Sequence, residues 1–311
     1  MKLVFCGTPH FAVPTLEALI AARHEIALVV SQPDRPVGRS QQLTAPPVKQ
    51  TALAAGLEVT QPEKIKSNVD FRTRLESIAP DAIIVVAYGR IIPPWMLALP
   101  RLGCINLHGS LLPKYRGAAP IQWAIAMGET ITGNTTMLLE EGLDTGPILL
   151  QREIPIRSGQ TAVDLFDLLA RDGATLVVET LVGLESDGIA PKPQDHARAS
   201  LAPLLDREDG RMDFSARTAT ELWNRWRGFQ PWPGAFTTLQ GKKLIVHAMQ
   251  VAPANRPAEP GTMEIEDHRL LVACAQNTWI EIAELQIEGK KRLTASEFLR
   301  GAGLKSGERL G

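Results

Sequence analysis

Cysteine is scarce in this sequence, and long apolar runs are missing from it. Three cysteines in 311 residues, Cys6, Cys104 and Cys274, lie far apart, which argues against a disulfide framework and against a zinc site built from cysteines. No apolar run reaches the roughly 18 residues that a membrane-spanning helix needs. The first residues enter a strand pattern with no targeting segment before it. We therefore expect a cytoplasmic protein that does not engage a membrane.

An excess of charge of one sign is also missing. The chain has 33 Lys and Arg against 34 Asp and Glu, a net charge of −1, which excludes a simple basic nucleic-acid binder. Residues 1–189 hold 16 basic and 19 acidic residues, whereas residues 190–311 hold 17 and 15. If a nucleic acid is a partner, we expect few phosphate contacts and a modest salt dependence.

Short β-rich runs alternate with helical patterns through the first half of the chain. Residues 3–6, 26–30, 82–87 and 104–107 are nearly unbroken apolar runs, as in strands that are buried on both faces. Amphipathic patterns at 11–22 and 69–78 separate them. This alternation predicts an α/β domain with a doubly wound, mostly parallel sheet of the Rossmann-like type, whose ligands bind beyond the carboxyl ends of the strands.

The composition changes after a long helical pattern at residues 162–184. Prolines punctuate a polar stretch there, which we interpret as a linker at 190–205 between a domain at 1–189 and a second domain at 206–311. The second domain has short apolar runs at 243–249, 262–265, 270–273 and 279–282. They predict a small β-rich barrel or sandwich.

The turn after the first strand reads Gly-Thr-Pro-His-Phe from Gly7. It lacks the second and third glycines of a dinucleotide-binding fingerprint, which disfavours a nicotinamide cofactor. We expect Thr8 to cap the following helix and His10 to be a solvated turn residue.

Asn106 and His108 stand two residues apart at the end of an expected strand, so their side chains project to the same side. Gly109 then breaks the strand. An isolated histidine at such a place is usually structural, but an amide beside an imidazole at the carboxyl edge of a parallel sheet favours a catalytic site. The amide can donate to a developing oxyanion, and the imidazole can exchange a proton near neutral pH.

Asp144 lies between Gly142 and Gly146, after an expected strand at 135–139. Taken alone it fits a turn closed by its own side chain. Together with Asn106 and His108 it supplies a carboxylate that can orient the histidine and favour its protonated form. No cluster of ligand-type residues has metal-binding spacing, so we expect no metal.

Three further features allow two interpretations each. Residues 32–47 show no periodicity, so this segment is either functional or a mobile loop. Arg35 and Arg39 favour a functional loop that contacts phosphate groups. Around Trp223 and Trp226, aromatic and basic residues could stack nucleotides, but the spacing favours core tryptophans with the arginines on a solvated face. The cluster Lys290, Lys291 and Arg292 is either a charged turn or a site that binds backbone phosphates of a nucleic acid.

These motifs resemble the folate-dependent formyltransferases over nearly the whole chain. The stretch from Asn106 to Pro113 and the Leu-Asp-Thr-Gly run containing Asp144 match the signature of that superfamily. The closer resemblance, carried by residues 7–12, 32–39, 120–122, 231–233 and 289–299, is to the methionyl-tRNA formyltransferase family. It implies a Rossmann-like catalytic domain, a C-terminal OB-like β-barrel that binds tRNA, and 10-formyltetrahydrofolate as formyl donor to charged initiator tRNA.

The resemblance also implies roles for individual residues. Asn106, His108 and Asp144 form the catalytic group. The residues that the resemblance assigns to the folate site are Ser110, Leu111, Leu112, Pro113, Tyr88, Arg90 and Ile92. Those assigned to tRNA are Arg35, Arg39, Lys290, Lys291 and Arg292. A monomer is expected.

The sequence departs from the family in the loop that the resemblance assigns to the tRNA acceptor end. It has Ser40, Gln41 and Gln42 where lysines are usual, and His10 where an acidic residue is usual. Fewer loop cations should weaken tRNA binding and flatten its salt dependence.

Other functions stay open on the sequence alone. One is formylation of a nucleotide-linked amino sugar by the same catalytic residues, and another is hydrolysis of formyltetrahydrofolate, which would need no acceptor amine. A third, from a different class, is a non-catalytic RNA-binding module with an OB-like barrel. Intact Asn106, His108 and Asp144 argue against the last.

Overall fold

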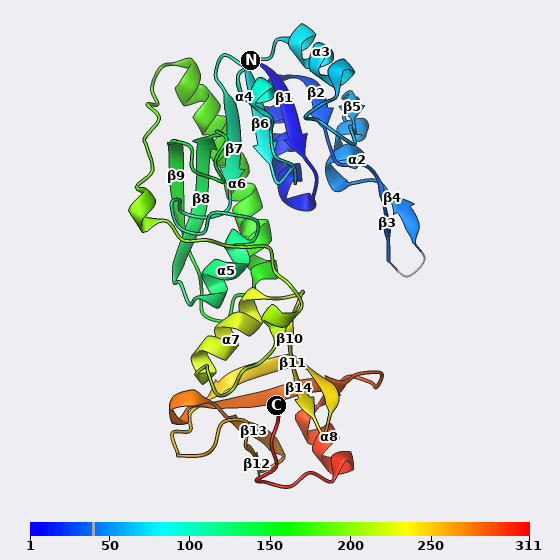
Figure 1. Cartoon of the computed structure of the whole chain (residues 1–311), viewed down its shortest axis with the longest axis vertical. Helices are drawn as coiled ribbons and strands as arrows, with labels where there is room; N and C mark the ends of the chain where they lie inside the picture. The colour runs from blue at the N-terminus through cyan, green and yellow to red at the C-terminus, as the bar shows by residue number, and fades with distance from the viewer. Residues whose placement is uncertain (39–40) are drawn as a thin grey trace. The chain divides into compact units, whose positions relative to one another are not determined.

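The computed structural model describes residues 1–38 and 41–311, so Arg39 and Ser40 lie outside the described part of the chain. The chain divides into two compact units (Figure 1). The N-terminal unit consists of Met1–Pro120, Ile131–Pro155 and Leu165–Pro203. The C-terminal unit consists of Ile121–Thr130, Ile156–Asp164 and Leu204–Gly311. Each unit has a hydrophobic core of its own.

The N-terminal unit is built on a seven-stranded sheet with the order β5-β2-β1-β6-β7-β8-β9 (Figure 1). The strands are β1 (Lys2–Gly7), β2 (Glu25–Val30), β5 (Val59–Thr60), β6 (Ala82–Val86), β7 (Cys104–His108), β8 (Ile131–Leu138) and β9 (Ile148–Pro155). The strands from β5 to β7 run parallel, whereas β8 is antiparallel to both β7 and β9. The prediction of a Rossmann-like, mostly parallel sheet is confirmed.

Helices pack on both faces of this sheet, because successive side chains of a strand point to opposite faces. Leu3 and Phe5 of β1 belong to one core, which also takes residues from α1, α2 and α6. Val4 and Cys6 belong to a second core, with residues from α3 and α4. The helices are α1 (Val13–Ala21), α2 (Pro47–Ala54), α3 (Val69–Ile78), α4 (Pro94–Leu97) and α6 (Ala162–Glu185).

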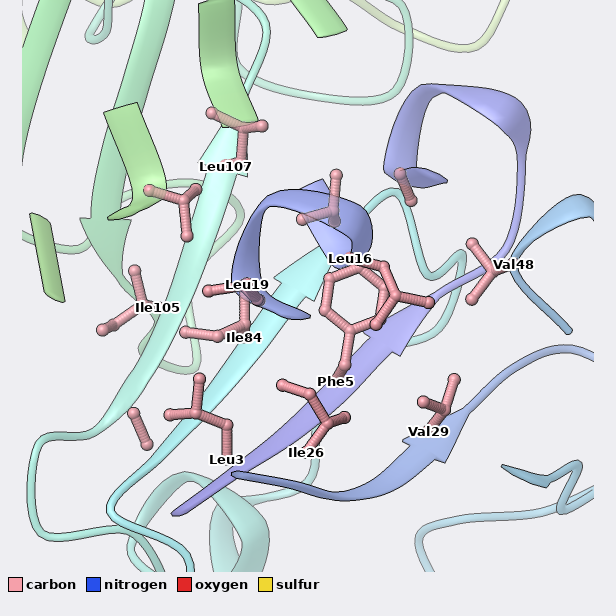
Figure 2. Close-up of a cluster of buried hydrophobic side chains, with 14 of the residues drawn as sticks. Leu3, Phe5, Leu16, Leu19, Ile26, Val29, Val48, Ile84, Ile105 and Leu107 are labelled. Atoms are coloured by element: carbon pink, nitrogen blue, oxygen red, sulfur yellow. The ribbon is translucent and has the colours of Figure 1, made fainter. Parts of the chain in front are cut away.

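Leu16 of α1 lies beside Phe5 in the first core and is fully buried (Figure 2). Leu16→Ala should lower the free energy of unfolding by about 2–5 kcal/mol, since it removes apolar contacts and leaves a cavity. Urea denaturation followed by circular dichroism measures this loss. Leu53→Ala on α2, at a side chain that is 56% exposed, is the control and should change stability by less than about 0.5 kcal/mol. Equal losses in the two variants would contradict the assignment of this core.

The long segment after β2 differs from the sequence prediction. Residues 32–47, expected to lack regular structure, contain an antiparallel hairpin of β3 (Arg35–Val37) and β4 (Gln42–Thr44). Each strand has three residues, and all of β4 is exposed, so no apolar period marks the hairpin in the sequence. Strand β5, with two residues, is too short for a period to mark it in the sequence.

The C-terminal unit contains an antiparallel sheet with the order β10-β11-β14-β13-β12, and β15 pairs with β14. Its elements are α5 (Pro120–Ala126), α7 (Ala219–Gly228), β10 (Ala235–Leu239), β11 (Lys242–Ala252), β12 (Met263–Glu266), β13 (Arg269–Ala273), β14 (Trp279–Ile287), β15 (Leu293–Thr294) and α8 (Ala295–Ala302). The four apolar runs predicted in this region overlap β11, β12, β13 and β14.

The last residues of the chain join the two edges of this sheet. Leu310 donates its backbone N–H to the carbonyl of Gly261, just before β12, at 2.9 Å. Gly311 donates its N–H to the carbonyl of Thr238, in β10, at 3.1 Å. Backbone groups at both edges are thereby paired, as closure of a sheet requires. The prediction of a small β domain at the C-terminal end is confirmed.

All three cysteines are buried free thiols. Burial raises the pKa of Cys104 and of Cys274 to about 12 and raises that of Cys6 well above its ordinary value. They therefore stay protonated at neutral pH and act as small apolar core residues.

In the described ranges, no helix is both long and apolar enough to cross a membrane.

Candidate active site

The end of β7 places two polar side chains on one face of the sheet. Asn106 and His108 are 9% and 5% exposed. β7 lies between the parallel β6 and the antiparallel β8, so Asn106 is flanked by Val85 and Met137. The side chain of Asn106 makes no hydrogen bond to any other residue that the structure describes. Its amide is therefore available to a ligand, and the assignment of Asn106 to the catalytic group stays a prediction from the sequence.

The imidazole of His108 has an acceptor oxygen near each ring nitrogen. Nε2 lies 2.9 Å from the carbonyl oxygen of Tyr115, which can only accept, so Nε2 carries a proton. Nδ1 lies 3.7 Å from Oδ2 of Asp144. A neutral imidazole can donate to only one of these oxygens, whereas an imidazolium can donate toward both. Both ring nitrogens thus face oxygen atoms that can accept a hydrogen bond.

Asp144 is held in an uncommon backbone conformation. Its φ is +50°, in the left-handed region that few residues other than glycine adopt. Its Oδ2 accepts a hydrogen bond of 2.8 Å from the N–H of Gly117, 27 residues earlier in the chain. The carboxylate is thus bound at long range and does not close a local turn. Oδ2 and His108 Nδ1 are farther apart than a direct hydrogen bond, which leaves room for both to contact a third atom.

The predicted folate residues after β7 form a closely hydrogen-bonded loop. Ser110 is fully buried, and its hydroxyl donates to the carbonyl of Lys114 at 2.7 Å. The Thr135 hydroxyl donates to the carbonyl of Ser110 at 2.6 Å and accepts from the N–H of Leu112 at 3.2 Å. Leu112 is buried, whereas Leu111 and Pro113 are partly exposed. The last two are the apolar surface that this loop can offer to a ligand.

The second predicted folate segment follows β6. Tyr88 is 2% exposed and belongs to the second core, where burial raises the pKa of its hydroxyl well above the ordinary value. Its carbonyl accepts from the Thr8 hydroxyl at 3.0 Å and from Gln32 Nε2 at 3.2 Å. The expectation that Thr8 caps a helix was wrong, because its hydroxyl joins the ends of β1 and β6.

Arg90 and Ile92 lie in the same segment. Arg90 Nε donates to Gln32 Oε1 at 3.0 Å, and its Nη1 donates to the carbonyl of Glu63. Ile92 is buried in the second core. Contact of this segment with a ligand would therefore come chiefly from its backbone.

Of the predicted tRNA residues that the structure describes, all four are exposed. Arg35 is exposed in the β3–β4 hairpin, whereas Arg39 lies outside the described residues. Lys290 and Lys291 are exposed in the turn between β14 and β15, and Arg292 forms an ion pair with Glu284. His10 is exposed, as expected.

The arginines of α7 were predicted wrongly. Trp223 and Trp226 pack against the C-terminal core, as expected. Arg227, however, is only 5% exposed, and its guanidinium lies 4.2 Å from the ring centroid of Trp223 and donates to the carbonyl of Gln160 at 2.9 Å. Burial lowers the pKa of Arg225 and Arg227. Both guanidinium groups stack on aromatic rings and donate hydrogen bonds within the unit, so neither is on a solvated face.

A cavity of about 710 Å³ lies in the C-terminal unit. Its lining includes the arginines Arg211, Arg217, Arg225 and Arg309. Three of these four face carboxylates, at distances of 4.0 Å to Glu208, 3.6 Å to Asp209 and 2.9 Å to Glu259. The cavity therefore offers less free positive charge than its composition suggests.

In the part of the chain that the structure covers, no three His, Cys, Asp or Glu residues gather as a metal site would require.

Sequence reasoning missed two buried residues near Asp144. Gln194 is 6% exposed and donates to the backbone carbonyl of Asp144, and Arg116 is 7% exposed and donates to Gln194. Gln194 lies in the segment predicted as a linker. A glutamine between prolines and polar residues carries no signal of a long-range role, so only the folded contacts show it.

The fold and these motifs define a class of protein, and comparison with known families shows it. Residues 1–181 match the family described as formyl transferase, and residues 204–303 match its C-terminal domain. The chain belongs to the formyl transferase family.

Full-length relatives narrow the class to the methionyl-tRNA formyltransferases. The enzyme of that name from Acidobacterium capsulatum is 66% identical over 100% of both chains. The one from Koribacter versatilis is 57% identical over 100% of this chain and 99% of its own length. At such identity over the full length, the activity and the enzyme class predicted from the sequence are confirmed.

Solved structures with the same fold include enzymes that formylate sugars. The sugar 3N-formyl transferase WlaRD has a TM-score of 0.66 at 18% identity and covers 94% of this chain and 99% of its own. An N-formyltransferase from Helicobacter canadensis, also at a TM-score of 0.66 and 18% identity, covers 91% and 98%. At this identity the likeness establishes the fold alone.

Proposed function

We propose that the chain transfers the formyl group of 10-formyltetrahydrofolate to the α-amino group of methionyl initiator tRNA, in the cytoplasm and as a monomer. The observation that carries the chemistry is the placement of His108 and Asp144 3.7 Å apart beside Asn106, which shares the face of β7 with His108. This combines an amide donor, an imidazole and a carboxylate, which suits transfer of an acyl group to an amine.

The first step is attack by the neutral amine on the formyl carbon. A carbon–nitrogen bond forms, and the carbonyl electrons move to the formyl oxygen to give a tetrahedral oxyanion. The amide of Asn106 and the Nδ1–H of a protonated His108 donate to this oxygen. In a buried site each such donor is worth about 10²–10³ in rate. The Tyr115 carbonyl, by engaging Nε2, directs the Nδ1 edge of the ring toward the reacting atoms.

The attacking nitrogen must then lose a proton. Asp144 is the carboxylate that takes it, directly or through a water molecule, and the intermediate collapses by breaking the bond to the folate nitrogen, which receives a proton. The N–H of Gly117 holds Oδ2 in place during these steps.

The folate co-substrate suits the surfaces on either side of Asn106. Leu111 and Pro113 offer partly exposed apolar area, and the backbone after β6 offers polar groups. The structures of WlaRD and of the Helicobacter canadensis enzyme were determined with 5-N-formyl-THF and folinic acid respectively, which supports a folate as the donor in this fold.

Exposed cations bind the charged tRNA: Arg35 in the β3–β4 hairpin, and Lys290, Lys291 and Arg292 after β14. The same role is assigned from the sequence to Arg39, which lies outside the described residues. Arg292 contributes less than the two lysines, because Glu284 already pairs with it.

Arg35→Gln tests the role of the hairpin. The substitution should raise KM for methionyl-tRNA several-fold with little change in KM for the folate, since it removes a phosphate contact far in sequence from the catalytic residues. The dependence of tRNA affinity on salt should also lose about one unit of slope on logarithmic axes. Steady-state kinetics at several salt concentrations measure both effects. Equal increases in the two KM values would contradict a tRNA-gripping role.

The choice of acceptor separates this function from its nearest rival. The enzyme is given 10-formyltetrahydrofolate with either charged initiator tRNA or a nucleotide-linked amino sugar, and the formylated product is identified by mass spectrometry. We expect formyl-methionyl-tRNA alone. Formylation of the sugar amine, or release of formate without an acceptor, would support the sugar transferase or the hydrolase instead.

A further inference from the structure

The loop that carries Asp144 depends on residues far from it in the sequence. Asp144 has a φ of +50°, a conformation that costs a non-glycine residue energy. Two residues later, a Cβ on Gly146 would lie 1.9 Å from the carbonyl oxygen of Leu138, so the backbone there is closely packed. A carboxylate on such a turn points in a defined direction only if other groups fix the turn.

Gln194 fixes the turn from the opposite side of the loop. Its Nε2 donates to the carbonyl of Asp144 at 2.9 Å and to that of Gly146 at 2.7 Å. Its Oε1 accepts from Nε of Arg116 at 3.2 Å and from Nη2 at 2.6 Å. Both protons and both acceptor positions of the amide are therefore used. A buried amide with every group satisfied is rigid and orients its partners strongly.

Arg116 connects this amide to the carboxylate itself. Its backbone N–H donates to the carbonyl of Ser200 at 2.8 Å, and its own carbonyl accepts from Ala202 at 2.7 Å. The next residue is Gly117, whose N–H binds Asp144 Oδ2 at 2.8 Å. The chain thus forms a closed circuit: Asp144 carboxylate, Gly117, Arg116, Gln194 and the Asp144 carbonyl.

Gly117 fits this circuit because it has no side chain. Its φ is +121°, and a Cβ there would lie 2.6 Å from the carbonyl oxygen of Ala202. The backbone segments 109–119, 142–146 and 194–202 therefore lie close together, and hydrogen bonds join them.

We propose that Gln194, held by Arg116, is the positioning residue for Asp144 and sets the direction of its carboxylate toward His108. This inference rests on the proposed catalytic role of Asp144. Gln194 acts through the backbone of the Asp144 loop, and its effect is therefore on turnover of the bound substrates rather than on their binding.

Gln194→Glu is the most informative variant, because it changes one end of the amide and keeps the other. A glutamate keeps an oxygen for Arg116, but it replaces the donor amino group with an oxygen that repels the carbonyls of Asp144 and Gly146. We expect kcat to fall by about 10–100-fold, while KM for both substrates stays within about threefold. Gln160→Glu makes the same chemical change in the C-terminal unit, where Gln160 Oε1 accepts from the Arg157 N–H, and should leave kcat unchanged.

The decisive comparison repeats Gln194→Glu in an Asp144→Ala background. If Gln194 acts by positioning Asp144, the second substitution should lower kcat by less than about twofold there, because no carboxylate remains to be placed. A purely structural role would lower kcat by the same factor in both backgrounds and would overturn the proposal. The melting temperatures of all variants show whether a loss of activity comes from unfolding. If Gln194→Glu does not fold, the milder Gln194→Met takes its place in both backgrounds.

The outcomes separate this inference from the proposed function. If Asp144→Ala alone keeps near-normal turnover, the catalytic role of Asp144 fails, and the inference with it. If Asp144→Ala is nearly inactive while folded Gln194→Glu is fully active, the inference alone fails.

Discussion

Asp144→Asn should lower kcat for formyl transfer to methionyl-tRNA by about 10²–10⁴-fold. The asparagine oxygen can still accept the hydrogen bond from the Gly117 N–H, so the loop keeps its main contact. The substitution removes the negative charge that faces His108 Nδ1 and, with it, the proposed acceptor of the amine proton. General base catalysis contributes rate factors of this order. Transfer of labelled formyl from 10-formyltetrahydrofolate to charged tRNA, under saturating substrates, measures the loss.

Glu141→Gln is the matched control for this change. Glu141 is exposed three residues before Asp144, and its substitution removes the same charge from the same loop. Its kcat should stay within about twofold of the unchanged enzyme. Comparable losses in the two variants would mean that the charge of the loop, rather than the bound carboxylate, matters.

His108→Ala should also reduce kcat strongly, by about 10²–10³-fold, since it removes an oxyanion donor. It also removes the hydrogen bond between the ring and the buried carbonyl of Tyr115, so the free energy of unfolding should fall by about 1–3 kcal/mol. His108→Gln separates the two effects, because its amide can donate to that carbonyl but cannot carry a positive charge. We expect His108→Gln to be stable and nearly as slow as His108→Ala.

Exposed His10 provides the control for the histidine variants. It lies in the same N-terminal unit, in the turn after β1, and His10→Ala should leave kcat within about twofold. Near-normal turnover of a folded His108→Gln enzyme would show that the charge on the imidazole is not used.

The parts of the fold that were predictable are those with a strong local pattern. Residues 82–87 are all apolar, and residues 104–107 are apolar except for Asn106, because β6 and β7 are buried on both faces. Helix α3 begins at Val69 and ends at Ile78, as its periodicity indicates. The β3–β4 hairpin gave no such pattern, since its strands are short and β4 is exposed. Arg227 was misplaced because helical periodicity shows which residues share a face, but not that a guanidinium can be buried over a tryptophan.

The sequence predicts which side chains the candidate site contains, but it does not predict the residues that hold the Asp144 loop in place. Asn106 and His108 share a strand, so a spacing of two residues is enough to place them together. Asp144 taken alone fits a local turn; it was added because it supplies a carboxylate to Asn106 and His108 and because its turn matches a known signature. Gln194 and Arg116 escaped notice, because their bonds span 50 and 78 residues and follow from tertiary packing that no local pattern encodes.

We propose that His108 and Asp144 act as one unit in formyl transfer. The single-turnover rate of formyl transfer to methionyl-tRNA, measured in His108→Gln, in Asp144→Asn and in the double variant, tests this coupling. If the two residues work together, the double variant should be no more than about threefold slower than the slower single variant, because either substitution already disables the unit. A double variant whose loss equals the product of the two single losses would contradict the account.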